Sequence, residues 1–316
     1  MKKNSNLNKA KTAKADEFYT QLSDIELELK HYRPHFKDKV VFCNCDDPEW
    51  SNFWMFFSLN FEFLGLKKLI ATHYEQDKPS YKLELVRDVN GDGKINGLDT
   101  IKTPLKQNGD FRSDEAIEIL KEADIVVSNP PFSLFREYIA QLEEFNKDFL
   151  IVGNNNAITY TGVFKMIKEG KLWLGVNANK TMEFRLPDSY ETYKRLDEDG
   201  NKFANVPAIS WFTNLSHNRR NEEIISYKTY EGNEKDYPTY DNYDSIEVDK
   251  VVDIPLNYKG VMAVPISFMS KWNPNQFEIL GCNRGVDQDP NKVYGRSSYL
   301  NGKETFKRIF IKFKNL

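Results

Sequence analysis

The sequence predicts an α/β fold: a doubly wound, mostly parallel Rossmann-like sheet, followed by a smaller β-rich C-terminal region. Short apolar runs such as Val40–Cys43 alternate with amphipathic segments between residues 40 and 168. A strand, a helix and a second strand follow one another in about 35 residues, which is the βαβ unit of a parallel sheet. After about residue 205 the segments become β-like, so we expect a second region there.

The composition is that of a large globular chain. It has 316 residues, of which 40% are hydrophobic, so one large domain with an appendage or two modest domains can form. The net charge of −3 gives no overall basic signature, so a nucleic-acid partner would need local cationic patches. Cys43, Cys45 and Cys282 are too few for a disulfide framework, and no run approaches the ~20 apolar residues of a membrane span. We therefore expect a cytoplasmic protein that does not contact a membrane. We also expect a monomer.

Two helix starts are predicted from capping residues. Ser23 and Glu26 have capping-box spacing, ahead of a helix that ends before Pro34. Asp47 and Pro48 predict an N-cap followed by proline at the first position of an aromatic-rich helix.

The remaining elements follow from apolar runs and periodicity. Strands are expected at residues 40–43, 69–75, 125–127 and 149–152, and helices at 115–121, 133–145 and 163–168. Further β-like segments are 206–212, 248–254 and 261–269. We predict a disordered basic arm at 1–15, a first domain at 16–215 and a second region at 216–316.

The most informative motif is Asn129-Pro130-Pro131-Phe132, directly after an apolar strand. Proline fixes its backbone angle and has no N–H donor, so the turn offers carbonyl groups beside an aromatic ring. If the Asn129 side-chain oxygen and the Pro130 carbonyl accept the two N–H groups of a base amine, the nitrogen lone pair is freed for attack. Phe132 would stack on the base, which is worth about 1–3 kcal/mol. The alternative interpretation is an ordinary turn after a buried strand.

Two acidic residues strengthen the functional interpretation. Asp110 and Phe111 precede the motif by one predicted helix and suit an adenine amine and its face. Glu75 ends the second predicted strand, where α/β nucleotide sites place an acid on ribose hydroxyls. Either acid alone could be a solvated residue at a strand end. Together they predict a site for an adenosyl cofactor.

These motifs lie in longer segments that resemble the EcoRI-type adenine-specific DNA methyltransferases. The matching segments are residues 18–20, 44–48, 71–75, 109–113, 124–135, 153–160 and 264–268. The resemblance implies a class I S-adenosylmethionine-dependent enzyme that methylates the exocyclic N6 amine of a flipped-out adenine in double-stranded DNA. It also implies a restriction-modification context, in which a cognate endonuclease shares the same DNA site.

The resemblance also assigns roles to individual residues. The implied catalytic loop consists of Asn129, Pro130, Pro131 and Phe132. The implied contacts to S-adenosyl-L-methionine are Phe18, Tyr19 and Thr20 at its methionine end, Asn44, Asp46 and Asp47 in the first loop, Glu75 at the ribose, and Asp110 and Phe111 at the adenine. The order of the motifs is similar to the γ arrangement of amino-methyltransferases, which implies a catalytic domain at 16–215 and a DNA target-recognition region at 216–316. One departure is that residues 42–47 contain no glycine, although methyltransferase first loops usually need one.

Residues 88–99 match a calcium-loop pattern, with Asp88, Asn90, Asp92 and Asp99 as candidate ligands. The context argues against it, because residues 81–85 alternate like a strand and Pro104 interrupts any following helix. Asn-Gly and Asp-Gly pairs also form tight turns. We therefore expect no metal here, with calcium as the alternative.

Cationic residues near the C-terminus are candidates for DNA phosphates. Arg219 and Arg220 are the preferred ones, ahead of Lys303, Lys307, Arg308, Lys312 and Lys314, which alternate with apolar residues as a solvated strand face would.

Two other functions stay open. One is methylation of a protein glutamine or an RNA base, and the other is binding of DNA or cofactor without turnover.

Overall fold

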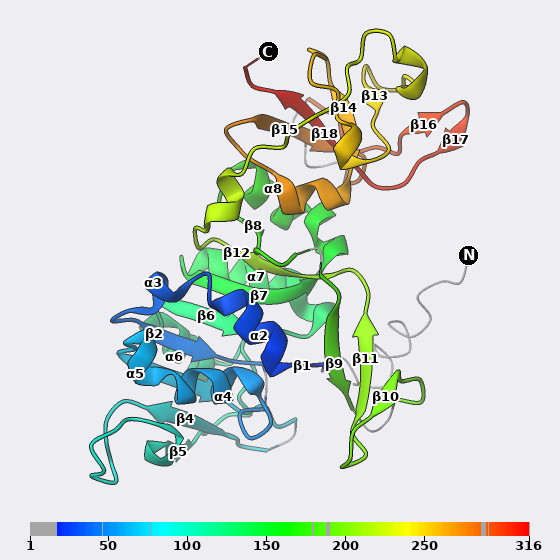
Figure 1. The fold of residues 1–316 in the computed structure, drawn as a ribbon. Coiled ribbons are helices and arrows are strands. Elements are labelled where there is room, and N and C mark those ends of the chain that lie inside the picture. The colour runs from blue at the N-terminus through cyan, green and yellow to red at the C-terminus, as the bar shows by residue number, and fades with distance from the viewer. Residues whose placement is uncertain are drawn as a thin grey trace. The chain divides into compact units, whose positions relative to one another are not determined.

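The computed structural model describes residues 18–45, 47–76, 78–178, 180–187, 190–285, 289 and 291–315. The predicted arm at 1–15 and Asp46 lie outside this part. The chain divides into two compact units (Figure 1). The first contains Met1–Asn154 and Gly175–Leu215, and the second contains Asn155–Leu174 and Ser216–Leu316. The chain therefore enters the second unit twice, whereas the sequence predicted a single boundary near 215.

A large sheet forms the centre of the first unit. Its strands follow the order β5-β4-β3-β2-β6-β7-β12. They are β2 (Val40–Cys43), β3 (Lys68–Thr72), β4 (Tyr81–Leu85), β5 (Ile101–Pro104), β6 (Ile125–Ser128), β7 (Asp148–Asn154) and β12 (Ile209–Thr213). The central strands β3, β2, β6 and β7 are parallel, and β4, β5 and β12 pair antiparallel at the flanks. The predicted mixed α/β architecture is confirmed.

Helices lie on both faces of this sheet (Figure 1). Alternate strand residues such as Val41 and Cys43 share one core with α2 (Leu22–Leu29), α3 (Arg33–Phe36), α4 (Asn52–Leu59) and α5 (Phe61–Leu64). On the opposite face, α6 (Asp114–Glu122) packs on β2 and α7 (Phe135–Glu144) packs on β7. Burial on both faces explains why the central strands are continuous apolar runs.

Both predicted helix caps are wrong. Helix α2 begins at Leu22 with Gln21 at its N-cap, so Ser23 already lies inside the helix. Helix α4 begins at Asn52 and is capped by Ser51, whose hydroxyl accepts the Phe53 N–H at 3.2 Å. Asp47 instead accepts the Glu49 N–H at 2.9 Å, because its side chain forms a turn that ends before the helix.

Helix α2 ends at Leu29, before Pro34, which lies in the first turn of the separate helix α3. Proline is tolerated there because the first N–H groups of a helix have no intrahelical partner.

A second, antiparallel sheet in the first unit has the order β1-β9-β11-β10. Its strands are β1 (Tyr19–Thr20), β9 (Met182–Leu186), β11 (Lys202–Val206) and β10 (Arg195–Leu196). Strand β1 pairs with β9, which holds the N-terminal segment in place. The predicted single segment 206–212 is two strands, β11 and β12, because the chain turns at Ala208, which has a φ of 60°.

The second unit is rich in β structure at its C-terminal part, as predicted. Its main sheet has the order β13-β14-β18-β15, with strands β13 (Ile246–Glu247), β14 (Met262–Pro265), β18 (Arg308–Phe313) and β15 (Phe277–Cys282). A hairpin joins β16 (Tyr299–Leu300) and β17 (Lys303–Glu304), and the unit also contains α8 (Thr161–Lys168) and β8 (Trp173–Leu174). Its core includes Tyr240 and Tyr243, which pack with Phe310.

Two predicted strands of this region differ from the structure. The segment 248–254 contains the 3₁₀ helix Val251–Asp253, and the segment 261–269 continues after β14 as the 3₁₀ helix Ile266–Lys271.

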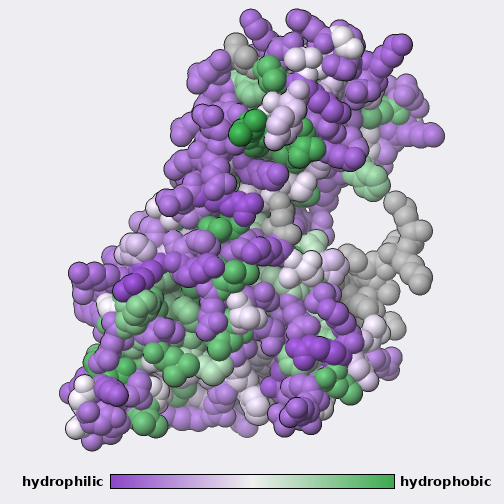
Figure 2. Space-filling model, in the orientation of Figure 1, coloured by the Kyte–Doolittle hydropathy of each residue, from purple (hydrophilic) through white to green (hydrophobic). Residues whose placement is uncertain are grey.

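The visible surface is mostly hydrophilic, with small separate groups of hydrophobic residues (Figure 2). In the described ranges, no helix is both long and apolar enough to cross a membrane.

Candidate active site

Predicted site residues follow three neighbouring parallel strands of the first unit. Asn44 follows β2, Glu75 lies just beyond β3, and Asn129 follows β6. Because β2 lies between β3 and β6, the carboxyl ends of these strands meet at one edge of the sheet. After β2, the chain forms β3 on one side of β2 and later forms β6 on the other side. Such a change of direction is where open α/β sheets bind ligands.

Asn129 is buried, and only one end of its side-chain amide has a partner. Its Nδ2 donates to the Phe18 carbonyl, which fixes the amide orientation because a carbonyl can only accept. The Oδ1 atom therefore faces the other way, and it has no hydrogen-bond partner among the described residues. A buried acceptor without a donor costs about 1–3 kcal/mol. It is therefore an atom that a ligand N–H can satisfy.

The predicted catalytic loop also contains the backbone carbonyl of Pro130 and the aromatic ring of Phe132. Pro130 is buried, and none of the described residues donates to its carbonyl oxygen. The Phe132 ring is partly buried and stacks on Phe18, with centroids 5.8 Å apart and planes inclined by 25°. Phe18 also makes edge contacts with Phe184 and Tyr190. The predicted cofactor residue Phe18 thus contacts the predicted catalytic loop through both its carbonyl and its ring.

The glycine-free loop after β2 is held by two side chains that the sequence did not indicate. The Asn44 side-chain oxygen accepts from the Tyr138 hydroxyl of α7, and the Asn44 carbonyl accepts from Ser128 at the end of β6. Burial raises the pKa of Tyr138 well above its ordinary value, so it remains a donor at neutral pH. The next residue, Cys45, has a φ of 79°. Cysteine therefore takes the left-handed conformation that glycine usually supplies.

Asp47 and Glu75 lie on two adjacent loops. One carboxylate oxygen of Asp47 is 3.6 Å from His73 Nε2, and the His73 ring stacks on Tyr81 with centroids 4.8 Å apart. The Glu75 N–H donates to the Asn108 carbonyl at 2.8 Å, and its carboxylate is 3.6 Å from Lys78. The Glu75 side chain is 38% exposed at the sheet edge. Its carboxylate could therefore accept ligand hydroxyl groups.

Gly109 brings the Asp110 loop against the end of β3. Its φ is 78°, and a Cβ at this position would lie 1.9 Å from the His73 carbonyl oxygen. Only glycine satisfies both the backbone angle and the contact. The loop therefore places Asp110 beside the segment that carries Glu75.

Asp110 forms a two-point ion pair with Arg112, at 2.9 Å to Nε and 2.8 Å to Nη2. The Arg112 guanidinium holds the pKa of Asp110 below its ordinary value, so the carboxylate is charged at neutral pH. Arg112 also contacts Glu137 of α7 at 3.1 Å. Phe111 is buried and packs edge-on against Tyr138, with centroids 5.1 Å apart.

Two further buried hydroxyl groups in the first unit have no partner among the described residues. They are Thr20 Oγ1 in β1 and Thr72 Oγ1 at the end of β3. Together with Asn129 Oδ1, they leave unsatisfied polar atoms beside the predicted cofactor segments. A ligand rich in hydroxyl, amine and carboxylate groups fits such an arrangement.

The two predicted DNA-contact residues lie in the second unit, in the 3₁₀ helix Asn218–Asn221. The Arg220 guanidinium lies 3.6 Å from the Trp173 ring centroid, and burial lowers its pKa. Arg219 lines a cavity of about 330 Å³ that also contains Glu222, Glu223 and Lys271. Arg308 is buried and paired with Glu247, so its charge is already neutralised inside the unit.

The calcium-like loop is a turn between β4 and β5 that is held by its own backbone. The Asp88 carboxylate accepts from Gly91 and Gly93 at 2.6 and 2.8 Å, and the buried Asp99 accepts from Val89, Asn90 and Asn96. Asn90 and Asp92 each accept from an N–H two residues on. Within the described ranges, no group of three or more His, Cys, Asp or Glu side chains is arranged to hold a metal ion.

Sequence reasoning missed Tyr138, Ser128, His73 and Arg112. A signal for Tyr138 existed, because it lies in the apolar stripe of α7 at residues 135, 138, 139 and 142. A tyrosine in such a stripe needs a partner for its hydroxyl. The partner itself is 94 residues away and could not be predicted from local spacing.

A central parallel sheet with an Asn-Pro-Pro-Phe loop at its switch point, and an unsatisfied amide oxygen in that loop, defines the class of amino-methyltransferases. Comparison with known proteins gives the particular family. Residues 6–314 match the family model described as adenine-specific methyltransferase EcoRI. The chain belongs to this family.

Curated relatives match over nearly their whole length. The chain is 48% identical to the Type II methyltransferase M.EcoRI of Escherichia coli, covering 99% of this chain and 98% of the relative. It is 42% identical to the Type II methyltransferase M.MpnI of Mycoplasma pneumoniae, covering 96% and 97% respectively. The prediction of an EcoRI-type adenine-specific DNA methyltransferase is confirmed.

Proposed function

We propose that the chain transfers a methyl group from S-adenosyl-L-methionine to the N6 amine of an adenine that has been flipped out of duplex DNA. The observation that carries this proposal is the buried Asn129 Oδ1, which faces away from Phe18 and has no partner among the described residues. An adenine amine can donate to this atom. The family match supports the reaction class and the adenine base.

In this mechanism the catalytic loop aligns and activates the amine. Asn129 Oδ1 accepts one N–H and the Pro130 carbonyl accepts the other, which draws the nitrogen toward tetrahedral geometry and frees its lone pair. Pro131 keeps the turn rigid, and Phe132 stacks on the base while Phe18 supports the opposite side of that ring. The amine becomes cationic as it gains the methyl group and only afterwards loses a proton to water, so none of these residues has to be ionised.

The first unit would hold the methyl donor along the edge of its sheet. When bound, S-adenosylmethionine supplies a methyl group made electrophilic by a sulfonium. Phe18, Tyr19 and Thr20 would contact its methionine end, and Asn44 and Asp47 would line it from the first loop, while Asp46 lies outside the described residues. The partly exposed Glu75 would accept the ribose hydroxyl groups. Asp110 retains acceptor capacity beside Arg112 for the adenine amine, with Phe111 next to it.

This assignment implies a Rossmann-like methyltransferase fold for the first unit and a DNA target-recognition role for the C-terminal region. Several relatives are named Type II methyltransferases, which supports a restriction-modification context with an endonuclease of the same specificity. Arg219 remains a candidate for phosphate contact, whereas Arg220 lies over Trp173 and would need to leave it.

The test is transfer of tritiated methyl groups to three substrates: duplex DNA, RNA and protein. We expect incorporation into duplex DNA, with the label in N6-methyladenine after nucleoside digestion. Asn129→Ala should reduce the rate at saturating substrates by about 100-fold or more, as for removal of one preorganised hydrogen bond at a reacting atom.

Asn52→Ala is a matched control for this test. Asn52 also donates its amide to a backbone carbonyl of the N-terminal segment, that of Thr20 at 2.7 Å, but it does not lie in the catalytic loop. Asn52→Ala should keep the parent rate at saturating cofactor. Label in RNA or in protein glutamine would favour the alternative substrates. Cofactor binding without transfer to any of the three would favour a binding protein.

A further inference from the structure

In the second unit, an exposed phenylalanine is presented on a rigidly held backbone. Phe306 is 74% exposed. Its carbonyl accepts from Nδ2 of Asn283 at 2.7 Å, and Asn283 is itself completely buried. Asn283 Oδ1 also accepts the Arg308 N–H at 2.7 Å. The chain on the C-terminal side of Phe306 is therefore fixed by a buried amide.

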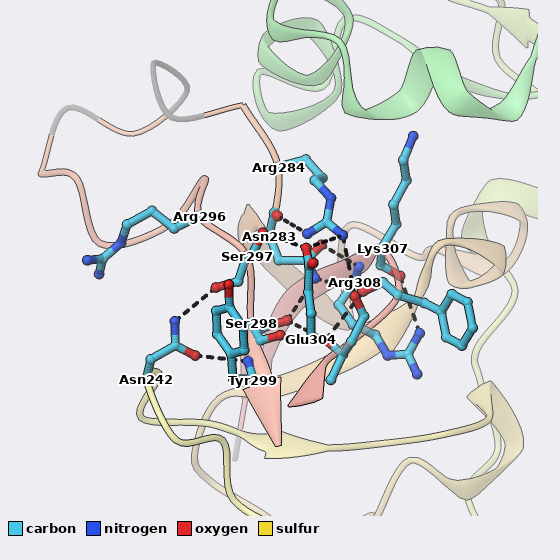
Figure 3. A network of polar contacts seen from close by, with 12 residues as sticks. Asn242, Asn283, Arg284, Arg296, Ser297, Ser298, Tyr299, Glu304, Lys307 and Arg308 are labelled. Atoms are coloured by element: carbon cyan, nitrogen blue, oxygen red, sulfur yellow. Dashed lines mark hydrogen bonds and ion pairs between the residues drawn. The ribbon is translucent and has the colours of Figure 1, made fainter. Parts of the chain in front are cut away.

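The N-terminal side of Phe306 is fixed by the β16–β17 hairpin, which ends at Glu304. The Thr305 N–H donates to the Ser298 carbonyl at 2.9 Å, and the hydroxyls of the two residues are 2.5 Å apart. Asn242 also holds the hairpin, because its side chain donates to the Ser297 carbonyl and accepts the Tyr299 N–H (Figure 3). An exposed ring on so constrained a backbone loses little further entropy when it binds.

Other exposed phenyl and indole rings of the described chain are covered by cations, and Phe306 is not. The Arg33 guanidinium lies 3.8 Å from the centroid of Phe63, and that of Arg185 lies 5.1 Å from Trp50. Phe306 has no ring or cation contact with any described residue. Its faces are open to a planar partner.

The charges around Phe306 favour a polyanion. Lys303, three residues before Phe306, forms no ion pair with a described acidic residue. Among the described residues, the Lys307 amine donates to neutral groups, Asn156 at 2.9 Å and Thr159 at 3.2 Å. The nearby carboxylate of Glu304 is already engaged by Arg284 at 3.3 Å and by Ser297 at 2.7 Å. An open ring beside cations that pair with no described carboxylate is a combination that binds nucleic acid through bases and phosphates.

We propose that Phe306 stacks on an unstacked base of the DNA substrate, and that Lys303 contacts a phosphate beside it. This inference rests on the proposed function only for the identity of the partner. It assigns a stacking residue and a phosphate contact within the proposed target-recognition region. The family match does not by itself identify such residues.

The test measures binding of the full chain to sheared, end-labelled genomic duplex DNA over a range of salt concentrations. Phe306→Ala should weaken binding roughly 5- to 100-fold, the range for loss of one stacked base, without changing the slope of log K against log salt. Phe306→Trp should restore binding, because it keeps a stacking surface. Lys303→Ala should reduce the magnitude of the salt slope by about 0.9, because one phosphate contact is lost.

Phe63→Ala removes a similarly exposed phenylalanine and should bind DNA as the parent chain does. The inference is overturned if Phe306→Ala binds as tightly as the parent, if Phe306→Trp is as weak as Phe306→Ala, or if the salt slope falls with Phe306→Ala. A lower melting temperature for Phe306→Ala would also overturn it, because the ring would then serve the fold. The proposed function fails separately, if the parent chain transfers no methyl group to adenine.

Discussion

At the scale of single residues, the two polar atoms of one amide differ in their surroundings. Asn129 Nδ2 donates to the Phe18 carbonyl, whereas its Oδ1 has no hydrogen-bond partner among the described residues. Asn44 accepts from Tyr138 and Ser128, so the first loop and the catalytic loop share supports. The position of Asn129 directly after β6 could be predicted from its neighbours in the sequence. Tyr138 could not, because its partner is distant along the chain.

Tyr138→Phe removes the hydroxyl and leaves Asn44 Oδ1 buried without a donor. We expect a loss of about 1–3 kcal/mol in the free energy of unfolding, together with a higher KM for the methyl donor. The KM for DNA should stay at the parent value, because Tyr138 supports the first loop. Denaturant unfolding and separate KM measurements check this. Equal increases in both KM values would contradict a role at the cofactor loop.

The Asp110–Arg112 pair predicts a defined pH dependence. The pKa of Asp110 is lowered by Arg112, so it lies below the value of about 3.9 expected in the unfolded chain. The stabilisation is therefore fully present above pH ~4 and is lost as the pH falls through the lowered pKa. We expect the difference in unfolding free energy between the parent and Arg112→Gln to be constant from pH 7 to pH ~5 and to shrink below pH ~4. A difference that already shrinks between pH 7 and 5 would contradict the assignment.

At the scale of elements, loops after the parallel strands are positioned by close backbone contacts. The central strands were predictable because burial on both faces produces continuous apolar runs. The caps of α2 and α4 were not predictable in the same way. Gln21 makes no side-chain cap hydrogen bond, so α2 begins without a capping signal. Ser51 caps α4 but lies close to Asp47, which is an equally plausible capping residue. Gly109 is the clearest example, because its backbone lies so close to the His73 carbonyl that it holds the Asp110 loop against the segment after β3.

Gly109→Ala should damage this loop in particular. The new Cβ would collide with the His73 carbonyl, and alanine is strained at a φ of 78°. We expect a loss of at least about 1–3 kcal/mol in the free energy of unfolding and weaker cofactor binding in calorimetric titration. Gly91→Ala is the matched control, because Gly91 also has a positive φ but nothing lies near its Cβ position. Cofactor affinity unchanged by Gly109→Ala would contradict the role of this loop.

At the scale of the whole molecule, the two-unit organisation could be predicted only in part. The change to β-like segments after residue 205 indicated a second region. The inclusion of Asn155–Leu174 in the second unit depends on contacts between distant parts of the chain, such as Lys168 with the Leu280 carbonyl at 2.9 Å. Local sequence patterns contain no information about such contacts.

The return of the chain to the first unit depends on a buried carboxylate. Glu28 of α2 accepts from the N–H groups of Val176 and Asn177, from the Asn177 side chain and from Tyr32. Glu28→Ala leaves these donors unsatisfied, so we expect a loss of roughly 3 kcal/mol or more in the free energy of unfolding. Glu26→Ala, on the exposed side of the same helix, should change it by less than about 0.5 kcal/mol. Similar losses in thermal or denaturant unfolding of the two variants would show that Glu28 does not hold this segment.

The central claim is that the amide of Asn129 prepares an adenine amine of DNA for methylation. The most direct measurement is base-modification sequencing of DNA from cells that express the parent chain or Asn129→Ala at equal levels. We predict N6-methyladenine at one recurring sequence with the parent chain and its loss with Asn129→Ala. Methyladenine at equal levels with both chains, or its absence with the parent chain, would contradict the account.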